Sequence, residues 1–336
     1  MEKYNLVLDL PDAFYEDKRF QKYFDYFESK ANVKHTHHAT AEDFHEDLGW
    51  ADAIIMWTFP EFLDEDFKYA THLKYLGKLN STRQTVEAAH RAGVQLSDMR
   101  GCYSLSVAEL ALGHILNVYR NISGYVNDMR NGTESWVIKA PIEFPDRDRE
   151  LSGQKVGIIG FGGVGQHLSR FLKPFTDDIV VSDPYIPQEV LDQYGVKKGD
   201  IKDIFSECDV IVSCAANNTA TEKLINKELI DSIKPGALFM NMGRAILVDN
   251  EALLERIRKH DIYVVMDVFE VEPLPKDHEF RKHENVYMTT HRGGTLYSFY
   301  QIFDNFVEDL EGVMERGEEA KWPVRTSQLH ALRDYK

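Results

Sequence analysis

A glycine string directly after a short apolar segment constrains the fold more than any other feature of this sequence. The string consists of Gly160, Phe161, Gly162, Gly163, Val164 and Gly165. Its spacing, G-x-G-x-x-G, follows the apolar run 155–159 and opens a segment with apolar residues at helical spacing. Glycines at these places permit a tight strand-to-helix turn, a close approach of the backbone to a pyrophosphate, and close packing of the helix on the strand. The string therefore predicts a dinucleotide-binding loop, with Gly163 and Val164 as part of it.

The acid that ends the next apolar run indicates which dinucleotide is bound. Asp183 follows the apolar residues 179–182. A carboxylate at this place accepts hydrogen bonds from the adenosine ribose hydroxyls and repels a 2′-phosphate, which favours NAD over NADP. The alternative is a glycine turn without a ligand, with Asp183 opening a turn before Pro184. Both features lie in one strand–helix–strand unit of the right length, which favours the nucleotide.

Short apolar segments alternate with helical patterns along most of the chain. Helices are expected at 17–30 and 85–92, and a long helix is expected from Ser104, capped by Ser104 or Ser106. The polar, proline-containing segment 131–148 is typical of an exposed connection. Because strands that alternate with helices form parallel sheets, we expect an α/β fold of two doubly wound parallel-sheet domains, the second a Rossmann NAD-binding domain. The expected strands are 5–10, 53–57, 73–77, 94–96, 155–159, 179–182, 210–213, 237–240 and 263–266.

Charge and composition exclude several classes of partner. The chain has 39 Lys and Arg against 55 Asp and Glu, a net charge of −16, which disfavours nucleic acid and anionic membranes. No apolar run approaches the roughly 18 residues that cross a bilayer, and residues 1–10 lack the apolar region of a signal peptide. The three cysteines, Cys102, Cys208 and Cys214, have no C-x-x-C spacing, which argues against a disulfide framework or a zinc site. A cytoplasmic protein is the expectation.

A cluster of histidines raises the question of a metal site. His35, His37 and His38 are close together, and imidazole is a common metal ligand. No matched carboxylate or cysteine spacing accompanies them, so a solvated polar strand is the favoured interpretation. We expect no metal.

Several further stretches share their residues with one enzyme family. They read SLSVAELA from residue 104, ELSGQKVGIIG from 150, KPGA from 234, NMGRA from 241, DVFEVEP from 267 and TH from 290. On these stretches the sequence resembles the D-isomer-specific 2-hydroxyacid dehydrogenase family. The resemblance implies an NAD-dependent oxidoreductase and suggests a homodimer with the helix after Ser104 in the interface. The domains expected are a substrate domain of residues 1–100 plus 300–336 and an NAD-binding domain of residues 101–299.

The resemblance implies catalytic roles for Arg244, Glu272 and His291. Arginine can grip a substrate carboxylate bidentately and polarise the adjacent carbonyl. Histidine can donate a proton to the carbonyl oxygen, or remove it in the oxidation direction. A carboxylate hydrogen-bonded to the imidazole holds its orientation and favours imidazolium. Taken singly, these residues could be a surface arginine, a loop carboxylate and a strand cap, but their order on strand ends of a nucleotide fold favours catalysis.

The resemblance also implies further contacts to NAD. Ala215 and Ala216 match a segment along the adenosine, and Thr221 matches a polar contact shortly after it. Met242 and Gly243 precede the catalytic arginine and complete this set. Asp267 matches a carboxylate that holds the nicotinamide carboxamide, with a helix cap or loop acid as the alternative.

The sequence departs from the family on the substrate side. The family has a glycine-rich loop after the strand at 73–77, whose backbone NH groups bind the substrate carboxylate, but residues 78–85 contain no glycine. Arg292, directly after the expected catalytic histidine, is also unusual. We hypothesise that Arg292, with Lys78 or Arg83, replaces the lost donors and meets an anionic or polyhydroxylated substrate. The alternative is that Arg292 forms a surface salt bridge.

The expected function is reversible, NAD-linked hydride transfer between nicotinamide and C2 of a D-2-hydroxy acid or 2-oxo acid. Two alternatives stay open. The altered loop is compatible with a relative that oxidises a different substrate, such as formate or phosphite. Some members of the superfamily are NADH-responsive transcriptional corepressors, which bind partners and do not depend on turnover.

Overall fold

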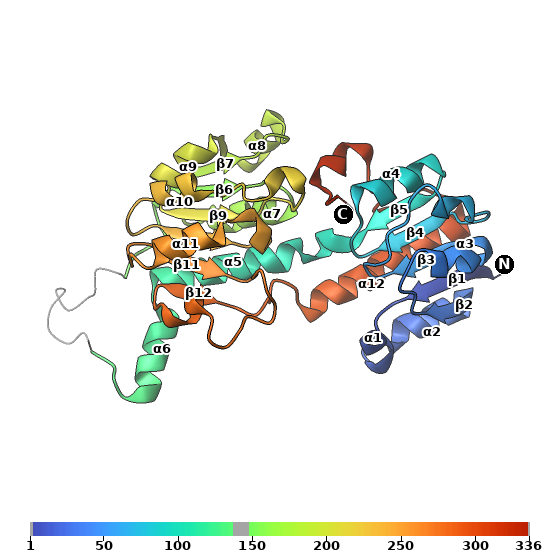
Figure 1. Ribbon diagram of the computed structural model, residues 1–336, viewed down its shortest axis with the longest axis horizontal. Coiled ribbons are helices and arrows are strands. Elements are labelled where there is room, and N and C mark those ends of the chain that lie inside the picture. Colours follow the sequence, from blue (N-terminus) through green and yellow to red (C-terminus); the bar gives the residue numbers. More distant parts are fainter. Residues whose placement is uncertain (1–2, 137–147, 335–336) are drawn as a thin grey trace. The chain divides into compact units, whose positions relative to one another are not determined.

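The computed structural model describes residues 3–136 and 148–334, which form two compact units (Figure 1). The first unit combines Met1–Cys102 with Thr295–Lys336, and the second is Tyr103–Gly294. The expected exposed connection falls mainly on 137–147, outside the described residues. None of the described helices combines the length and apolar character needed to cross a membrane.

A five-stranded parallel sheet forms the middle layer of the first unit. Its strand order is β2-β1-β3-β4-β5, so the direction of winding reverses between β1 and β3. The strands are β1 (Tyr4–Asp9), β2 (Ala31–Thr36), β3 (Ala53–Met56), β4 (Tyr75–Lys78) and β5 (Gln95–Asp98). β3 and β4 are buried at every position, as expected for strands that are covered on both faces.

Helices cover both faces of this sheet. They are α1 (Asp12–Glu16), α2 (Gln21–Lys30), α3 (His45–Trp50), α4 (Arg83–Arg91) and the C-terminal α12 (Leu296–Leu310). On one face, Phe24 of α2 packs edge-on against Phe303 of α12, with ring centroids 6.1 Å apart. A Cβ atom at Gly77 would lie 2.7 Å from the ring of Phe306, so this glycine lets α12 lie close to β4. On the other face, α3 and α4 share one apolar cluster with β3 and β4.

The second unit contains a seven-stranded parallel sheet. Its order is β12-β11-β10-β9-β6-β7-β8, and the winding reverses between β6 and β9, where ligands bind in sheets of this kind. The strands are β6 (Val156–Ile159), β7 (Ile179–Ser182), β8 (Lys197–Lys198), β9 (Val210–Ser213), β10 (Leu238–Asn241), β11 (Tyr263–Met266) and β12 (Val286–Met288). Carboxyl ends of neighbouring strands meet at one edge, which brings their loops together.

Two groups of helices sandwich this second sheet. The helices of this unit are α5 (Ser104–Tyr119), α6 (Ile122–Asn131), α7 (Gly163–Leu172), α8 (Gln188–Tyr194), α9 (Ile201–Glu207), α10 (Lys227–Ser232) and α11 (Asn250–Ile257), and all of them except α6 have buried residues that pack on the sheet. One apolar cluster joins α5, α7 and α8 to one face, and a second joins α9, α10 and α11 to the other. The two parallel sheets with helices on both faces confirm the predicted doubly wound α/β class.

Two local predictions were wrong, and two short strands were not predicted. The helix expected at 17–30 begins only at Gln21, because the Asp17 carboxylate accepts a hydrogen bond from Arg19 N (3.0 Å) and holds a turn before it. The helix expected from Ser104 does begin there, but its N-cap is Tyr103 and no side chain caps it. The strands β8 and β12 were not predicted, since two and three residues carry no usable periodicity.

Candidate active site

Three adjacent strands of the second unit bring Arg244, Glu272 and His291 to one edge of the sheet. Arg244 follows β10, Glu272 follows β11 and His291 follows β12, and these strands are neighbours in the order β12-β11-β10. Parallel pairing places all three carboxyl ends at the same edge. Residues that are distant in sequence are thereby collected in loops at the edge where α/β sheets bind ligands.

Glu272 and His291 form a hydrogen-bonded pair. Glu272 Oε2 lies 2.7 Å from His291 Nδ1, and Glu272 Oε1 accepts a hydrogen bond from Phe269 N at 2.9 Å. Partial burial pushes the pKa of Glu272 upward, but the hydrogen bonds from His291 and Phe269, with the charge of Arg244, bring this pKa below its usual value. The carboxylate is therefore ionised near neutrality. Since it engages Nδ1, the other ring nitrogen, Nε2, is the one left to exchange a proton with a ligand.

Asp267 anchors the loop that carries His291. Its carboxylate is only 3% exposed and accepts three hydrogen bonds from this loop: from Thr289 Oγ1 (2.6 Å), Arg292 N (2.7 Å) and Gly293 N (2.9 Å). His291 has a φ of 54°, in the left-handed region that non-glycine residues rarely adopt. The loop therefore holds His291 in a strained backbone conformation. The sequence offered Asp267 only as a carboxamide contact or a loop acid, and this anchoring was not foreseen in detail.

A buried asparagine that the sequence analysis missed fixes the turn before Arg244. Asn241 is fully buried; its Nδ2 donates to Arg244 O (2.9 Å) and its Oδ1 accepts from Gly243 N (3.1 Å). The Arg244 side chain is exposed, and its Nη1 donates to Gly243 O at 2.9 Å. Met242, between them, is buried. A polar residue at the end of an apolar strand was the available signal for Asn241.

The glycine loop has the shape expected of a phosphate cradle. Gly160 has a φ of +85°, and a Cβ there would lie 2.6 Å from the Cα of Ala215. A Cβ on Gly163 would collide with Ser104 Oγ, and one on Gly165 would lie 2.5 Å from Gly160 O. Gly162 is different, because a Cβ there meets nothing within 4 Å in the described chain. Packing thus explains three glycines, and Gly162 borders open space.

The first turn of α7 completes this cradle. Gly162 is the N-cap of α7, and the first intrahelical bond runs from Gln166 N to Gly162 O (3.0 Å). The amides of residues 163–165 precede this bond, so they are the N-terminal donors to which a helix binds an anion. Val164 lies within this turn. The residues present therefore fit a pyrophosphate.

Two of the other predicted nucleotide contacts, Asp183 and Ala215, lie against the glycine loop. Asp183 Oδ2 accepts a hydrogen bond from Phe161 N (2.8 Å) and its Oδ1 accepts one from Tyr185 N (2.9 Å), so this carboxylate is tied to the glycine loop. Each carboxylate oxygen has a further acceptor site for a ribose hydroxyl. Ala215 and Ala216 follow β9, and Thr221 Oγ1 donates to Ala216 O at 2.7 Å.

The three basic residues proposed for the substrate have different surroundings. Lys78 is fully buried: its ammonium donates to Pro60 O (2.8 Å) and pairs with Glu61 (3.2 Å), and burial lowers its pKa. Arg83 is exposed and pairs with Asp334 at 2.7 Å. Arg292 is exposed, its Nε donates to Thr290 Oγ1 (3.2 Å), and it forms no ion pair with any residue that the structure describes.

The loop after β4 uses its backbone donors internally. Leu79 N donates to Trp57 O (2.9 Å) and Ser81 N donates to Asp98 Oδ2 (2.7 Å). Thr82 N points to Glu61 Oε2 at 3.4 Å, and Glu61 also accepts from the hydroxyl of Thr82. A loop with these bonds has few NH groups left for a substrate carboxylate.

Comparison with known proteins finds dehydrogenases by sequence and by structure. The family model for the D-isomer-specific 2-hydroxyacid dehydrogenase, NAD-binding domain, matches residues 112–293. D-3-phosphoglycerate dehydrogenase of Methanocaldococcus jannaschii is 30% identical over 290 residues, 84% of this chain and 53% of that protein. The chain thus spans about half the length of that relative.

Two further proteins extend the comparison. Mitochondrial formate dehydrogenase of Solanum tuberosum is 31% identical over 236 residues, 69% of this chain and 61% of that protein. The crystal structure of a phosphoglycerate oxidoreductase from Rhizobium etli superposes with a TM-score of 0.80 at 25% identity, covering 96% of this chain and 98% of the other. Similarity to this solved structure therefore covers both units and is not confined to the nucleotide loop.

Proposed function

The chain belongs to the D-isomer-specific 2-hydroxyacid dehydrogenase family, and from this premise we propose that it transfers a hydride reversibly between NAD and C2 of a D-2-hydroxy acid or 2-oxo acid. The observation that carries the proposal is the 2.7 Å bond between His291 Nδ1 and Glu272 Oε2. A histidine oriented in this way suits an alcohol or carbonyl oxygen that gains or loses a proton. Oxidation of formate to carbon dioxide removes only a hydride, because the oxygens of formate carry no proton.

NAD, when bound, supplies or accepts the hydride. The amides at the start of α7 and the open space at Gly162 suit its pyrophosphate, and Asp183 suits its adenosine ribose. Ala215, Ala216, Thr221, Met242, Gly243 and Asp267 remain proposed contacts of the same cofactor. Their common support is their place around the carboxyl ends of β9, β10 and β11.

The chain's own residues would then do three things. Arg244 would hold the substrate carboxylate and orient the carbonyl beside it. His291 Nε2 would give a proton to the carbonyl oxygen during reduction and take it back during oxidation. Glu272 would hold the imidazole in place and stabilise its protonated form, and the Asp267 anchor would keep this geometry when ligands enter and leave.

Arg292 is the residue we propose for a second polar group of the substrate. It is exposed, lies next to His291 and forms no ion pair within the described chain, which supports the hypothesis over a surface salt bridge. Lys78 is buried and paired with Glu61, and Arg83 pairs with Asp334, so neither is proposed as a substrate contact. Replacing Arg292 with Ala should raise KM for substrates with a second anionic group or several hydroxyls; an unchanged KM would remove Arg292 from the site.

The test of the proposed function is NADH consumption by the purified protein on a panel of 2-oxo acids that vary in size, charge and hydroxylation. The His291→Ala variant should lose roughly 10²–10⁴-fold in kcat/KM while it still binds NADH. Turnover that survives in this variant would contradict the assignment of His291.

A second candidate is oxidation of a substrate that is not a hydroxy acid. The internal hydrogen bonds of the loop after β4 favour it, because they leave few donors for the carboxylate that a 2-hydroxy acid carries beside its reacting carbon, whereas formate and phosphite carry the transferred hydrogen on the charged group itself. NAD⁺ reduction with formate or phosphite, and none with the hydroxy acids, would establish this candidate. Tight NADH binding without turnover on any substrate would point to a cofactor-sensing, partner-binding role.

Two properties of the whole protein are part of the proposal. We propose a homodimer: the family resemblance places α5, the helix after Ser104, in its interface, and we add the exposed apolar face of α6. We also propose a cytoplasmic location, since all three cysteines are free, as is usual in a reducing compartment.

A further inference from the structure

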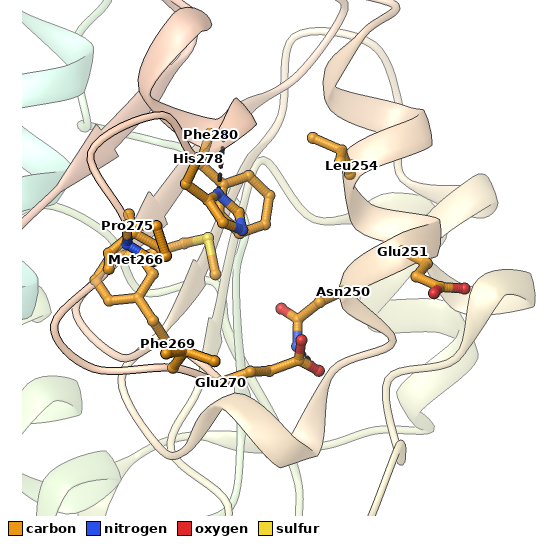
Figure 2. A pocket seen from close by; sticks show the side chains of 11 residues that line it. Asn250, Glu251, Leu254, Met266, Phe269, Glu270, Pro275, His278 and Phe280 are labelled. Atoms are coloured by element: carbon orange, nitrogen blue, oxygen red, sulfur yellow. Dashed lines mark hydrogen bonds between the residues drawn. The ribbon is translucent and has the colours of Figure 1, made fainter.

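A cavity of about 180 Å³ lies in the second unit, behind the loop that presents Glu272 (Figure 2). One wall is the start of α11, with Asn250 and Leu254. The opposite wall contains Met266, Phe269, His278 and Phe280. A cavity of this size accommodates one ring of about six carbon atoms. The proposed NAD contacts and the catalytic trio contribute none of these walls.

One residue of the cavity wall, Asn250, has a buried acceptor without a partner in the described chain. Asn250 Nδ2 donates to Glu270 Oε1 (3.0 Å) and to the backbone oxygens of Ala245 and Val248 (both 3.2 Å). Asn250 Oδ1 is buried and has no hydrogen-bond partner among the described residues. Figure 2 shows the Asn250 amide and the Glu270 carboxylate together on one side, facing the rings of His278 and Phe280. Because a buried acceptor without a donor is costly, an occupant that brings an N–H group would gain from it.

The charged and aromatic groups in the cavity walls indicate whether an occupant is a cation or an anion. Glu270 places a carboxylate beside Asn250, the side chain of Glu251 points away from the cavity (Figure 2), and no Lys or Arg is among the described residues that line the cavity. Phe269, His278 and Phe280 supply aromatic faces, with the last two rings 4.7 Å apart. Carboxylates and aromatic faces both attract organic cations, whereas they repel carboxylates and phosphates.

We propose that this cavity binds a small primary ammonium ion with an apolar body about as large as a benzene ring, and that its occupancy lowers the activity of the neighbouring catalytic pair. The ammonium group would meet Glu270, a turn of the Asn250 side chain would bring its Oδ1 to the same group, and the apolar body would lie against Leu254, Met266 and Phe280. The regulatory half of this inference rests on the proposed function, whereas the binding half does not.

The backbone provides the link between the cavity and catalysis. Phe269 lines the cavity with its side chain, and its amide donates to Glu272 Oε1 at 2.9 Å. Glu272 in turn holds His291 through its other oxygen at 2.7 Å. A ligand that displaces residues 269–271 therefore shifts the carboxylate that orients the imidazole. Hydrogen bonds depend steeply on distance and angle, so a small shift suffices.

Binding is measured first, by calorimetry on the whole protein with benzylammonium as the probe. We expect a Kd on the order of 0.1–1 mM for a ligand of this size. Benzyl alcohol and benzoate have the same ring without the positive charge, and they should bind at least ten times more weakly. Equal binding of benzyl alcohol would overturn the assignment of a cation, and no binding of benzylammonium would overturn the site.

Three variants locate the site. Glu270→Gln keeps the side-chain size and an oxygen for Asn250 but removes the charge, and it should weaken benzylammonium binding at least tenfold. Glu251→Gln is the matched control, because it removes the same charge from a side chain that points away from the cavity in Figure 2; it should change the Kd by about twofold or less. Leu254→Trp should fill the cavity and abolish binding. Unchanged binding in Leu254→Trp would place the probe elsewhere and contradict the proposal.

Activity is measured last, with whichever 2-oxo acid the wild-type protein reduces. Benzylammonium should lower kcat/KM of the wild type and cause no further change in Leu254→Trp, whose basal kcat/KM should already be lowered because its indole fills the cavity as the ligand does. Binding without inhibition would overturn the regulatory half. A wild type that turns over no 2-oxo acid would instead contradict the proposed function, and the calorimetry would still decide whether the site exists.

Discussion

At the scale of single residues, two carboxylates position His291 in different ways. Glu272 holds the imidazole side chain, with its partner atom 2.7 Å away, and Asp267 holds the backbone on both sides of it. The first carboxylate is about one third exposed and the second is 3% exposed. Replacing Glu272 should therefore reduce activity much more than stability, whereas replacing Asp267 should reduce stability as well.

Glu272→Gln should impair catalysis far more than stability. We expect kcat/KM to fall roughly 10²-fold, because the amide no longer stabilises a protonated imidazole. The loss in unfolding free energy should be about 1 kcal/mol or less, as for other exposed ion pairs. Since the pKa of Glu272 lies below its usual value, its contribution to stability is complete above the usual pKa of a glutamate and is lost as pH falls through the lowered one.

Urea unfolding of wild type and Glu272→Gln at several pH values checks this sign. The difference in unfolding free energy should be constant at neutral pH and shrink toward zero in acid. A difference that grows as the pH falls would contradict the direction of the pKa shift.

Asp267→Asn should impair stability as well. The asparagine has one oxygen for three donors, so at least one buried N–H or O–H of the loop 289–293 loses its acceptor. An unsatisfied buried group costs about 1–3 kcal/mol, which urea unfolding can measure. Thr289→Val is the control, because it removes one donor and leaves the carboxylate; it should cost less. If Asp267→Asn melts like the wild type and loses only NADH affinity, the carboxamide contact is the main role of Asp267.

At the scale of elements, two glycines of the loop after β6 have different roles: one is needed for packing and the other for the proposed ligand. Gly162→Ala places a methyl group where nothing lies within 4 Å in the described chain, so it should cost about 1 kcal/mol or less, the ordinary effect at an N-cap. It should nevertheless weaken NADH binding at least tenfold, if the pyrophosphate lies there. Gly165→Ala collides with Gly160 O and should destabilise the fold by about 1–3 kcal/mol.

Thermal melting and NADH fluorescence titration distinguish these two glycine variants. Undiminished NADH affinity in Gly162→Ala would move the pyrophosphate away from this turn. A Gly165→Ala protein as stable as the wild type would show that the helix can shift away from β6.

The elements that were predictable are those whose signal is local. Fully buried strands such as β6 and β9 read as continuous apolar runs, and the expected bounds differ from the observed ones by a residue or less. β8 consists of two exposed lysines at the sheet edge, and its pairing with β7 depends on neighbours distant in sequence. The identity of Arg244, Glu272 and His291 could be proposed from motifs. The anchoring by Asp267 and the burial of Lys78 could not, because both depend on contacts made only after folding.

At the scale of the whole molecule, an apolar stripe on α6 lacks a covering surface within the described chain. Ile122, Val126 and Met129 are 49%, 41% and 54% exposed, and their spacing places them on one face of the helix. α6 buries none of its residues and extends away from the sheet of the second unit (Figure 1). A helix of ten residues is marginal by itself in water, so its apolar face indicates a partner surface, for which we propose a second copy of the chain.

Val126→Glu should therefore convert a dimer into a monomer, because it places a charge at the centre of the stripe, where burial without a partner is costly. Sedimentation velocity over a range of concentrations measures the change. Asn127→Glu is the matched control, since it adds the same charge one residue along, outside the stripe, and should leave the dimer intact. Because Val126 lies on α6 and no catalytic residue does, the monomer should still bind NADH. A wild type that sediments as a monomer at all concentrations would require a different partner for α6.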